Sequence, residues 1–372
     1  MTYTTKEVLR ALSHVQEPDL KRDIVSLGMV RDVEIADDSI RFAIVLTTPA
    51  CPLKEVIRQE CEQAIAQHLS PSIKVHIHFM ADVTTLRNGE PLLPKVKNIV
   101  AIASGKGGVG KSTVTANLAI ALEQTGAKVG IIDADIFGPS IPTMFNCEAA
   151  HPGIVRKGDR NYLLPVEQYG IKLLSIGFLA PAENAVVWRG PMASSALRQF
   201  ITDTEWGELD YLLVDLPPGT SDIHLTLVQT VPLTGAVIVT TPQKVALSDA
   251  QKALAMFRQK PIDVPILGIV ENMSYFTPAE LPDHQYYLFG KDGGKMLARR
   301  NEVPFLGEIP LVQSIREAGD SGKPIAMSND MMAKAFKQIA AALAQRIALR
   351  NAQMEVIDEG RYGNRSPQGI ND

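Results

Sequence analysis

Cysteine is scarce in this sequence, and its scarcity excludes several kinds of protein. The 372 residues contain only Cys51, Cys61 and Cys147, which are too few and too widely spaced for the disulfide framework of a small secreted domain. No two of them stand in the C-x-x-C spacing that is typical of metal and cluster sites. We therefore expect neither a disulfide-stabilised scaffold nor a metal site built on a C-x-x-C pair.

Long apolar runs and an excess of basic charge are also missing. No run approaches the length that spans a membrane, and the first residues lack the apolar region of a signal peptide. Lysine and arginine number 37 against 41 aspartates and glutamates, and the two signs are interspersed, so no basic face indicates nucleic acid. We expect a cytoplasmic protein that binds neither nucleic acid nor membrane.

A turn-rich segment divides the chain into a short and a long part. Residues 87–96 include an Asn-Gly pair and two prolines and predict a linker. Residues 1–86 predict a small α+β domain. Its apolar periodicity predicts helices at residues 6–14 and 53–69 and strands at residues 30–35, 40–46 and 74–79.

The long part, residues 97–352, alternates short apolar runs with helical segments. The apolar runs recur at residues 99–103, 129–132, 209–214, 236–240 and 266–270. This alternation is typical of an α/β fold in which helices cover both faces of a mostly parallel sheet. An apolar stripe over residues 332–347 predicts a final helix docked on the core rather than on a membrane, and the polar residues 353–372 predict a flexible tail.

Residues 105–113 carry the strongest functional signal. They fit the pattern G-x-x-x-x-G-K-[ST], a loop that wraps polyphosphate between a strand and a helix. Backbone N–H groups of such a loop converge on the phosphate oxygens, Lys111 reaches the β- and γ-phosphates, and the Ser112 hydroxyl holds Mg²⁺. The sequence therefore predicts a P-loop NTPase, with nucleotide-binding residues Gly105, Lys106, Gly107, Gly108, Val109, Gly110, Lys111, Ser112 and Thr113.

A second lysine, Lys106, stands one residue into this loop. It cannot serve its own phosphates as well as Lys111 does, so we expect it to neutralise charge on the nucleotide of a partner subunit. This is the role of an arginine finger supplied in trans. The K-G-G-x-G-K-[ST] variant resembles the deviant Walker A family, which includes the Min, Par, nitrogenase-reductase and Mrp-type ATPases. We therefore expect a homodimer.

Three aspartates are placed to assist at the phosphates. Asp133 and Asp135 follow an apolar strand at positions i and i+2, so both point toward the crevice where such sheets bind ligands. We expect one to contact Mg²⁺ through water and the other to orient the attacking water; for one of the pair, a capping role before a turn is the alternative. Asp215 directly follows the apolar run 209–214, in the arrangement of a Walker B carboxylate. Slow, Mg²⁺-dependent ATP hydrolysis is predicted, with catalytic residues Lys106, Lys111, Asp135 and Asp215 and metal residues Ser112, Asp133 and Asp215.

Asn272 indicates the choice of base. It follows the apolar run 266–270, and an asparagine amide can donate to adenine and accept from it at once. No Asn-Lys-x-Asp run of the kind that reads guanine stands near it. We therefore expect ATP rather than GTP, and the alternative interpretation of Asn272 is a turn residue.

Longer segments resemble a known family over nearly the whole chain. Residues 187–192 (Val-Trp-Arg-Gly-Pro-Met), 215–222 (Asp-Leu-Pro-Pro-Gly-Thr-Ser-Asp), 271–274 (Glu-Asn-Met-Ser) and 314–324 are similar to bacterial Mrp/ApbC-type proteins. Segments 17–20, 24–30 and 47–52 resemble the small PaaD-like domain of iron–sulfur assembly proteins. The resemblance implies an ATP-hydrolysing homodimer that binds iron–sulfur clusters and passes them to apo-proteins or works with assembly factors.

The resemblance also implies roles for single residues. Lys106 matches the trans-acting lysine, Asp135 the switch I carboxylate that positions water, and Asp215 the switch II carboxylate. Cys51 matches the single cysteine that the small domain presents within Thr-Pro-Ala-Cys-Pro. We interpret Cys51 either as a reactive thiol, whose pKa a helix N-terminus would lower, or as a small buried residue before the helix at 53–69.

One departure from the family concerns the cluster ligands. Family members usually carry a C-x-x-C pair shortly after Glu-Asn-Met-Ser, so that two subunits supply four thiolates, but residues 275–286 contain no cysteine. Asp283 and His284 could substitute as ligands, and the alternative interpretation of these two residues is a solvated turn. His76 and His78, on one face of a strand, indicate either a metal site or two exposed polar positions. The functional alternatives are a cluster carrier and an ATP-dependent regulatory or adaptor switch that holds no cluster.

Overall fold

The computed structural model describes residues 3–36, 38–87, 92–136, 138–178, 190–220, 222–260, 262–278, 280–281, 283–329 and 331–362. Its contacts divide the chain into two compact units. One unit comprises Met1–Leu86 together with Ala344–Asp372, and the other comprises Arg87–Leu343.

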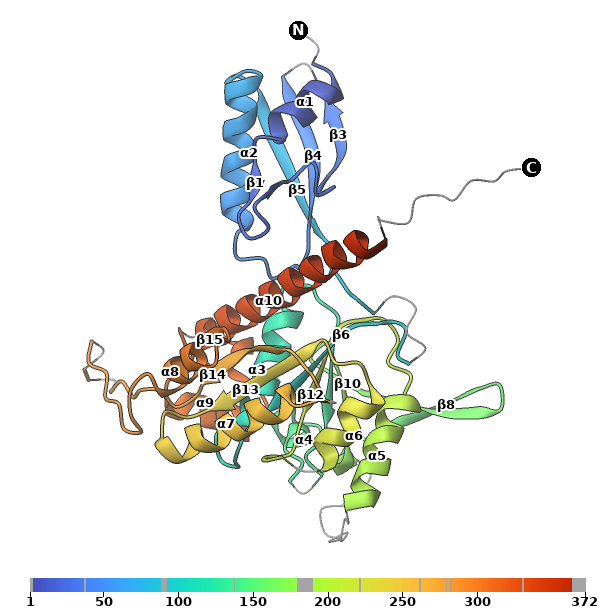
Figure 1. Ribbon diagram of the computed structural model, residues 1–372, viewed down its shortest axis with the longest axis vertical. Coiled ribbons are helices and arrows are strands. Elements are labelled where there is room, and N and C mark those ends of the chain that lie inside the picture. The colour runs from blue at the N-terminus through green and yellow to red at the C-terminus, as the bar shows by residue number, and fades with distance from the viewer. Residues whose placement is uncertain are drawn as a thin grey trace. The chain divides into compact units, whose positions relative to one another are not determined.

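The small unit is an α+β fold whose helices and strands lie close to the residues predicted for them (Figure 1). Its sheet has the order β3-β4-β5, with β4 antiparallel to β3 and parallel to β5. Alternate residues of β4, among them Phe42 and Ile44, enter a core with α1 and α2. The elements are α1 (Thr5–Leu12), β1 (Gln16–Glu17), β2 (Arg22–Asp23), β3 (Val30–Ile35), β4 (Ser39–Leu46), α2 (Lys54–His68) and β5 (Lys74–Ala81).

The large unit contains an eight-stranded sheet of order β10-β11-β7-β12-β6-β13-β14-β15. Every neighbouring pair is parallel except β10 and β11, which confirms the predicted fold class. Its strands are β6 (Val96–Ala103), β7 (Val129–Asp133), β10 (Val166–Gln168), β11 (Ile171–Ser175), β12 (Leu209–Asp215), β13 (Gly235–Thr240), β14 (Ile266–Glu271) and β15 (Phe305–Glu308). The sequence did not predict the separate hairpin of β8 (Gly153–Lys157) and β9 (Arg160–Leu164).

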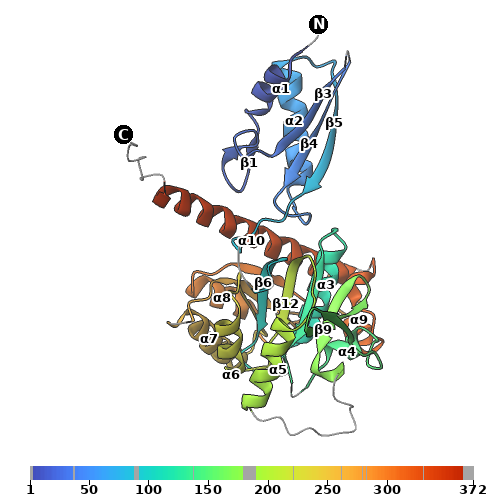
Figure 2. The same ribbon diagram turned by 90° about the vertical axis from the view of Figure 1, so that its right-hand side faces the viewer.

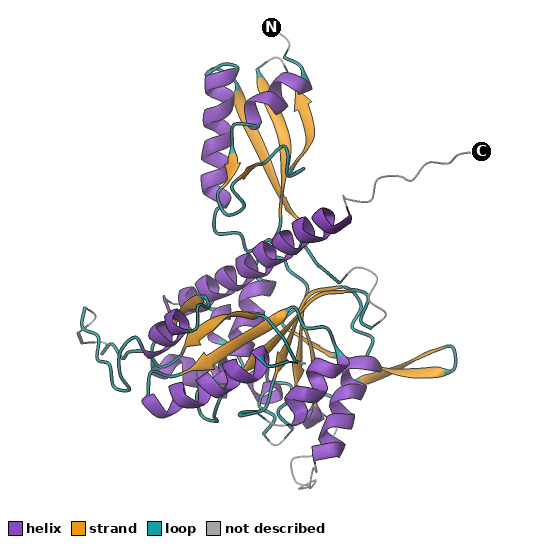
Figure 3. Cartoon of the chain, viewed as in Figure 1, coloured by secondary structure: helices purple, strands orange, loops and turns teal. Residues whose placement is uncertain are grey.

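Helices cover both faces of this sheet, and the central strands are therefore continuous apolar runs (Figures 2 and 3). One buried cluster joins one sheet face to α5 (Gly190–Thr202), α6 (Asp222–Thr230), α7 (Lys244–Arg258) and α8 (Gly293–Arg300). The other face carries α3 (Lys111–Glu123) (Figure 2). The remaining short elements are α4 (Ile141–Met144), η1 (Ile176–Phe178), α9 (Gln313–Asp320) and η2 (Ile325–Met327).

The final helix, α10 (Met331–Tyr362), docks on the core as its apolar stripe predicts. Phe336, Ile339 and Leu343 are buried, and Ile339 packs so closely on Gly307 of β15 that a Cβ there would lie 2.7 Å from its Cγ1. The helix runs past residue 353, where we expected a flexible tail, because no glycine or proline interrupts the sequence before Gly360. Residues 363–372 lie outside the described residues.

Hydrogen bonds from Arg87 hold the second half of the expected linker, residues 92–96, in place at the start of the large unit. The buried guanidinium of Arg87 donates hydrogen bonds to the carbonyl oxygens of Leu92 (2.7 Å) and Val96 (2.6 Å). Residues 88–91 lie outside the described residues. A charged side chain that supports backbone carbonyls in this way restrains the entry into β6.

Candidate nucleotide-binding site

The predicted phosphate loop connects β6 to α3 and depends on glycine at two positions. Gly110 precedes α3 with a φ of +79°, and a Cβ there would lie 2.3 Å from Nδ2 of Asn272. A Cβ on Gly105 would lie 2.1 Å from the carbonyl carbon of Asp249 in α7. Neither position has room for a side chain. The loop and the N-terminus of α3 line a cavity of about 220 Å³, which we call the phosphate cavity.

Three of the predicted residues, Lys111, Ser112 and Asp135, line this cavity, and Asp215 contacts two of them. Lys111 Nζ lies 2.7 Å from Asp215 Oδ2 and 4.0 Å from Asp135 Oδ2. The Ser112 hydroxyl donates to the same Asp215 oxygen at 2.6 Å. The structure therefore places together a cation, a hydroxyl and two carboxylates that are far apart in the sequence.

Thr115 belongs to this group but was missed by the sequence analysis. Its buried hydroxyl donates to Asp215 Oδ1 at 2.6 Å, so both carboxylate oxygens of Asp215 are engaged. Thr115 stands four residues after Lys111 and therefore on the same face of α3. That spacing is the signal that could have identified it.

Asp133 and Asp215 end the neighbouring strands β7 and β12 and are directly in register. Asp133 is fully buried, and burial together with the charge of Asp215 raises its pKa to about 7. Its carboxylate accepts hydrogen bonds from the Ser175 hydroxyl (3.0 Å) and from the backbone N–H groups of Asp135 (3.2 Å) and Ile141 (3.3 Å). Its oxygens are thus used by protein donors, and its contact with Mg²⁺ through water stays a prediction.

Lys106 lies half-buried on the same loop and lines the phosphate cavity with Pro218 of the Pro-Pro-Gly segment. Its backbone carbonyl accepts a hydrogen bond from the Ser104 hydroxyl at 3.0 Å. The loop conformation is thereby held locally, while the role of the Lys106 side chain across a dimer interface stays a prediction.

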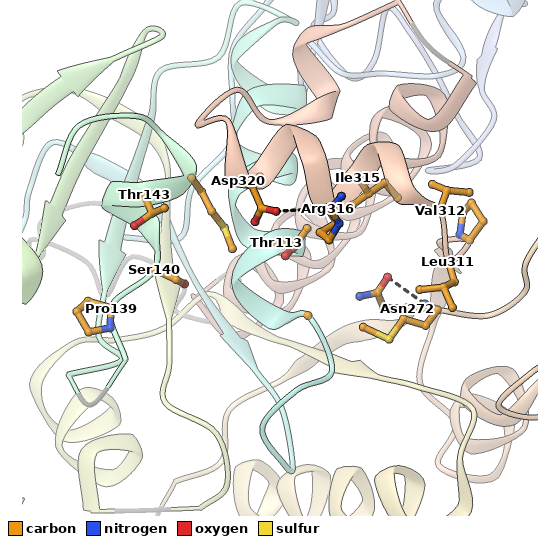
Figure 4. Close-up of a pocket in the computed structure, with 15 residues that line it drawn as sticks. Thr113, Pro139, Ser140, Thr143, Asn272, Leu311, Val312, Ile315, Arg316 and Asp320 are labelled. Carbon is orange, nitrogen blue, oxygen red and sulfur yellow. Dashed lines mark hydrogen bonds and ion pairs between the residues drawn. The ribbon is translucent and has the colours of Figure 1, made fainter.

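A second cavity of about 460 Å³ adjoins the first and shares Gly110, Thr113, Ser140 and Met144 with it. Figure 4 shows Pro139, Ser140 and Thr143 on one side of it, and Asn272, Leu311 and Val312 on the other. Its size and mixed lining suit a nucleoside beside the phosphates. The segment 310–320, which supplies the apolar wall and the Arg316–Asp320 ion pair (2.6 Å), was not predicted to line the site.

Asn272 lines this cavity, as its predicted contact with the base requires. Its side-chain amide is engaged, because Nδ2 donates to the carbonyl oxygen of Val109 (2.9 Å) and Oδ1 accepts from the N–H of Met273 (3.0 Å). In this arrangement Asn272 holds the phosphate loop to the end of β14. Reading of the base by Asn272 stays a prediction.

The cysteines do not assemble a thiolate site. Cys51 is half-buried, and burial and the charges of Glu17 and Asp19 raise its pKa, against the lowering by a helix N-terminus that we considered. Burial also raises the pKa of Cys61 to about 12 and that of Cys147 to about 11. Within the described parts of the chain, no three His, Cys, Asp or Glu side chains gather closely enough to hold a metal ion, and this covers Asp283 and His284.

His76 and His78 lie exposed on β5, an edge strand of the small sheet, as the alternating pattern predicts. Cys51, Glu17 and Asp19 line a small cavity of the small unit.

The Val187–Trp188–Arg189 segment that supported the family resemblance lies outside the described residues. No helix in the described part of the chain is both long enough and apolar enough to cross a membrane.

Two family models match the chain. One, described as the NUBPL iron-transfer P-loop NTPase, matches residues 95–344, and the other, described as an iron-sulfur cluster assembly protein, matches residues 5–77. The boundaries of both matches agree with the division into two units. A P-loop NTPase is, in general terms, a nucleotide hydrolase.

Relatives and a solved structure agree with these matches. An iron-sulfur cluster carrier protein of Synechocystis sp. is 49% identical over 350 residues, which cover 93% of this chain and 98% of the relative. The protein of the same description from Deinococcus radiodurans is 47% identical over 348 residues, 92% of this chain and 95% of the relative. A nucleotide-binding protein from Archaeoglobus fulgidus, solved with ADP, is 41% identical with a TM-score of 0.56, covering 64% of this chain and 91% of that one. The chain therefore belongs to the family of NUBPL-type iron-transfer P-loop NTPases, with an iron–sulfur cluster assembly domain ahead of the NTPase domain.

Proposed function

We propose that this protein is a slow, Mg²⁺-dependent ATPase that works as a homodimer and carries iron–sulfur clusters to apo-proteins. The observation that supports it most directly is that Lys111, Ser112 and Asp135 line one cavity at the N-terminus of α3, where Asp215 contacts Lys111 and Ser112. The relatives named as iron-sulfur cluster carriers support the cargo. Its three free thiols are in keeping with the cytoplasm, a reducing compartment.

The site offers each group that phosphoryl transfer to water needs. Backbone N–H groups at the start of α3 and the Lys111 ammonium bind the phosphates, and Lys111 exchanges its contact with Asp215 for the γ-phosphate. The Ser112 hydroxyl and the Asp215 carboxylate, 2.6 Å apart, are the hard oxygen donors that suit Mg²⁺, which would neutralise phosphate charge. We assign the orientation of the attacking water to Asp135, and its carboxylate, 4.0 Å from Lys111 Nζ, supports this role.

Measurements of ATP binding and of turnover distinguish the role of Lys111 from that of Asp135. Lys111→Ala should abolish binding of ATP measured by calorimetry, because the phosphate charge loses its buried partner. Asp135→Ala should retain binding within about threefold and lower kcat by about 10²-fold or more, the size expected when a group that positions the nucleophile is removed. Lys128→Ala, which removes an exposed lysine paired with Glu208 (2.6 Å), is the matched control. Equal turnover by Asp135→Ala and the parent protein would remove Asp135 from the mechanism.

The dimer is tested through Lys106. Light scattering with a non-hydrolysable ATP analogue should show association of the parent protein and weaker association of Lys106→Ala, because its ammonium neutralises phosphate charge on the other subunit. Turnover should fall with it. Unchanged association and turnover in Lys106→Ala would show that the lysine acts only within its own subunit or not at all.

An adaptor switch that holds no cluster is the second candidate function. It is favoured by one observation, the lack of any cysteine in residues 275–286, where the family usually carries its pair. Anaerobic reconstitution with iron and sulfide separates the two candidates. An absorbing cluster that the protein transfers to an apo-ferredoxin supports the carrier, and a protein that remains free of iron while it hydrolyses ATP supports the switch.

A further inference from the structure

Ser175, at the end of β11, lies beside Asp133, two residues before the proposed catalytic residue Asp135. It is in direct register with Asp133 on β7, and its side chain is fully buried. The hydroxyl donates to Asp133 Oδ2 at 3.0 Å and accepts from the backbone N–H of Gly177 at 3.1 Å. One buried hydroxyl therefore connects the carboxylate of Asp133 to the turn η1.

The carboxylate of Asp133 in turn holds the backbone on both sides of the next loop. Its Oδ1 accepts from the N–H of Asp135 (3.2 Å), and its Oδ2 accepts from the N–H of Ile141 (3.3 Å), the first residue of α4. Asp135 is the residue that the proposed function assigns to the attacking water. The position of its backbone thus depends on a carboxylate that Ser175 orients.

Packing on η1 reinforces this arrangement. A Cβ on Gly177 would lie 3.3 Å from Cγ of Pro142 and 3.4 Å from Pro139, so the turn is in contact with both prolines around the start of α4. Rotation of the Asp133 carboxylate would break the hydrogen bonds to Asp135 and Ile141 together. A fully buried carboxylate has no water to replace a lost donor.

We infer that Ser175 is a positioning residue for ATP hydrolysis: through Asp133 it holds the backbone N–H groups of Asp135 and Ile141 and so places the Asp135 carboxylate at the phosphate cavity. This inference rests on the proposed function for its effect on turnover, but its structural part does not. Ser175 is not among the described residues that line the phosphate cavity, and its printed hydrogen bonds go to Asp133 and Gly177. Its loss should therefore affect turnover and leave nucleotide binding intact.

The kinetic test compares Ser175→Ala with the parent protein in the full chain. Misplacement of a positioned group by about 1 Å costs up to about 10²-fold in rate, so we expect kcat to fall between about tenfold and 10²-fold. The KM for ATP and the affinity for a non-hydrolysable analogue should stay within about twofold, since the contacts of Lys111 and Ser112 are intact. Ser175→Thr, which keeps the hydroxyl, should recover part of the lost kcat.

The structural test measures hydrogen exchange of the Asp135 and Ile141 amides without nucleotide. Both amides should exchange about tenfold faster in Ser175→Ala and near the parent rate in Ser175→Thr, because their acceptor is Asp133. Thr234→Val is the matched control: the buried Thr234 hydroxyl accepts from the N–H of Ile99 at 3.1 Å, outside the phosphate cavity. It should change neither the two amides nor kcat.

These measurements distinguish the inference from the proposed function. If the parent protein lacks ATP turnover, the proposed function fails, and exchange at Asp135 and Ile141 still decides the role of Ser175. Unchanged exchange in Ser175→Ala overturns the inference, as does an equal fall in analogue affinity and kcat, which would indicate general damage to the site. Should Ser175→Ala fail to fold by circular dichroism, Ser175→Cys, with a similar volume and a weaker donor, takes its place in both tests.

Discussion

At the scale of single residues, the phosphate site is arranged around the carboxylate of Asp215. It is fully buried and accepts three side-chain hydrogen bonds, from Lys111, Ser112 and Thr115. Burial of a charge is costly unless its partners are complete. The site is therefore stable without nucleotide because Lys111 compensates Asp215, and this contact must open when phosphate binds.

Thr115→Val tests how far this network contributes to stability. The variant keeps the shape of the side chain but leaves Asp215 Oδ1 without its 2.6 Å donor, so we expect the free energy of unfolding to fall by about 1–3 kcal/mol. Urea denaturation of the nucleotide-free protein measures it. Thr125→Val removes an exposed threonine hydroxyl that donates to the Leu122 carbonyl and should stay within about 0.5 kcal/mol. Equal stability of the two variants would show that Thr115 contributes no net hydrogen-bond energy.

Most residues of the site were predictable, and those that were missed share a cause. Lys111 and Ser112 belong to a contiguous motif, and Asp135 and Asp215 follow strands whose carboxyl ends meet at one edge of the sheet. Ser175 is 42 positions from its acceptor Asp133, and no motif surrounds it. A hydroxyl acquires such a role only through the register of β7 and β11.

At the scale of elements, buried apolar periodicity was the reliable signal. It located α2, α7, α10 and the central strands because each buries a regular face or both faces. The hairpin β8–β9 escaped prediction because most of its residues are exposed and carry no apolar alternation. The polar residues after 353 predict a flexible tail, but α10 continues through them to Tyr362. Polar residues such as glutamate and arginine form helices well, so polarity alone does not indicate where a helix ends.

The docking of α10 should contribute strongly to the stability of the large unit. Phe336→Ala removes a fully buried ring from the helix, so we expect a loss of about 3–5 kcal/mol in the free energy of unfolding. Gln338→Ala, two residues away on the exposed side, should change it by less than about 0.5 kcal/mol. Thermal and chemical denaturation followed by circular dichroism compare the two. A small loss in Phe336→Ala would mean that the large unit is stable without this helix.

At the scale of the whole molecule, the cargo proposal depends on where thiolates are available. Cys61 is fully buried in the small unit, and Cys51 and Cys147 are half-buried. We propose Cys51 as the cluster ligand, since Cys61 belongs to the core and the pKa of Cys147 is raised to about 11. A single thiol per subunit binds a cluster weakly compared with four thiolates.

Reconstitution of the full chain with iron and sulfide should therefore yield a substoichiometric, oxygen-sensitive cluster. Cys51→Ser should lose it, because serine is a poor ligand for iron in place of a thiolate. Cys147→Ser should keep it and serves as the control. Iron counting and visible absorption measure both. An unchanged amount of cluster in Cys51→Ser would show that other residues are the ligands and would contradict the role that we propose for this thiol.

The sequence by itself determined the fold class, the phosphate loop and the family. A parallel sheet covered on both faces requires continuous apolar strands, and phosphate binding requires glycines, a lysine and a hydroxyl at fixed spacing, so these properties are written in local order. Only the tertiary structure decided which partners those groups have. The engaged amide of Asn272, the Thr115 hydroxyl on Asp215, and the Ser175 hydroxyl on Asp133 all join residues that local order leaves unrelated. Strand register and burial bring them together, because a buried polar group must find its partner wherever the packed chain provides one.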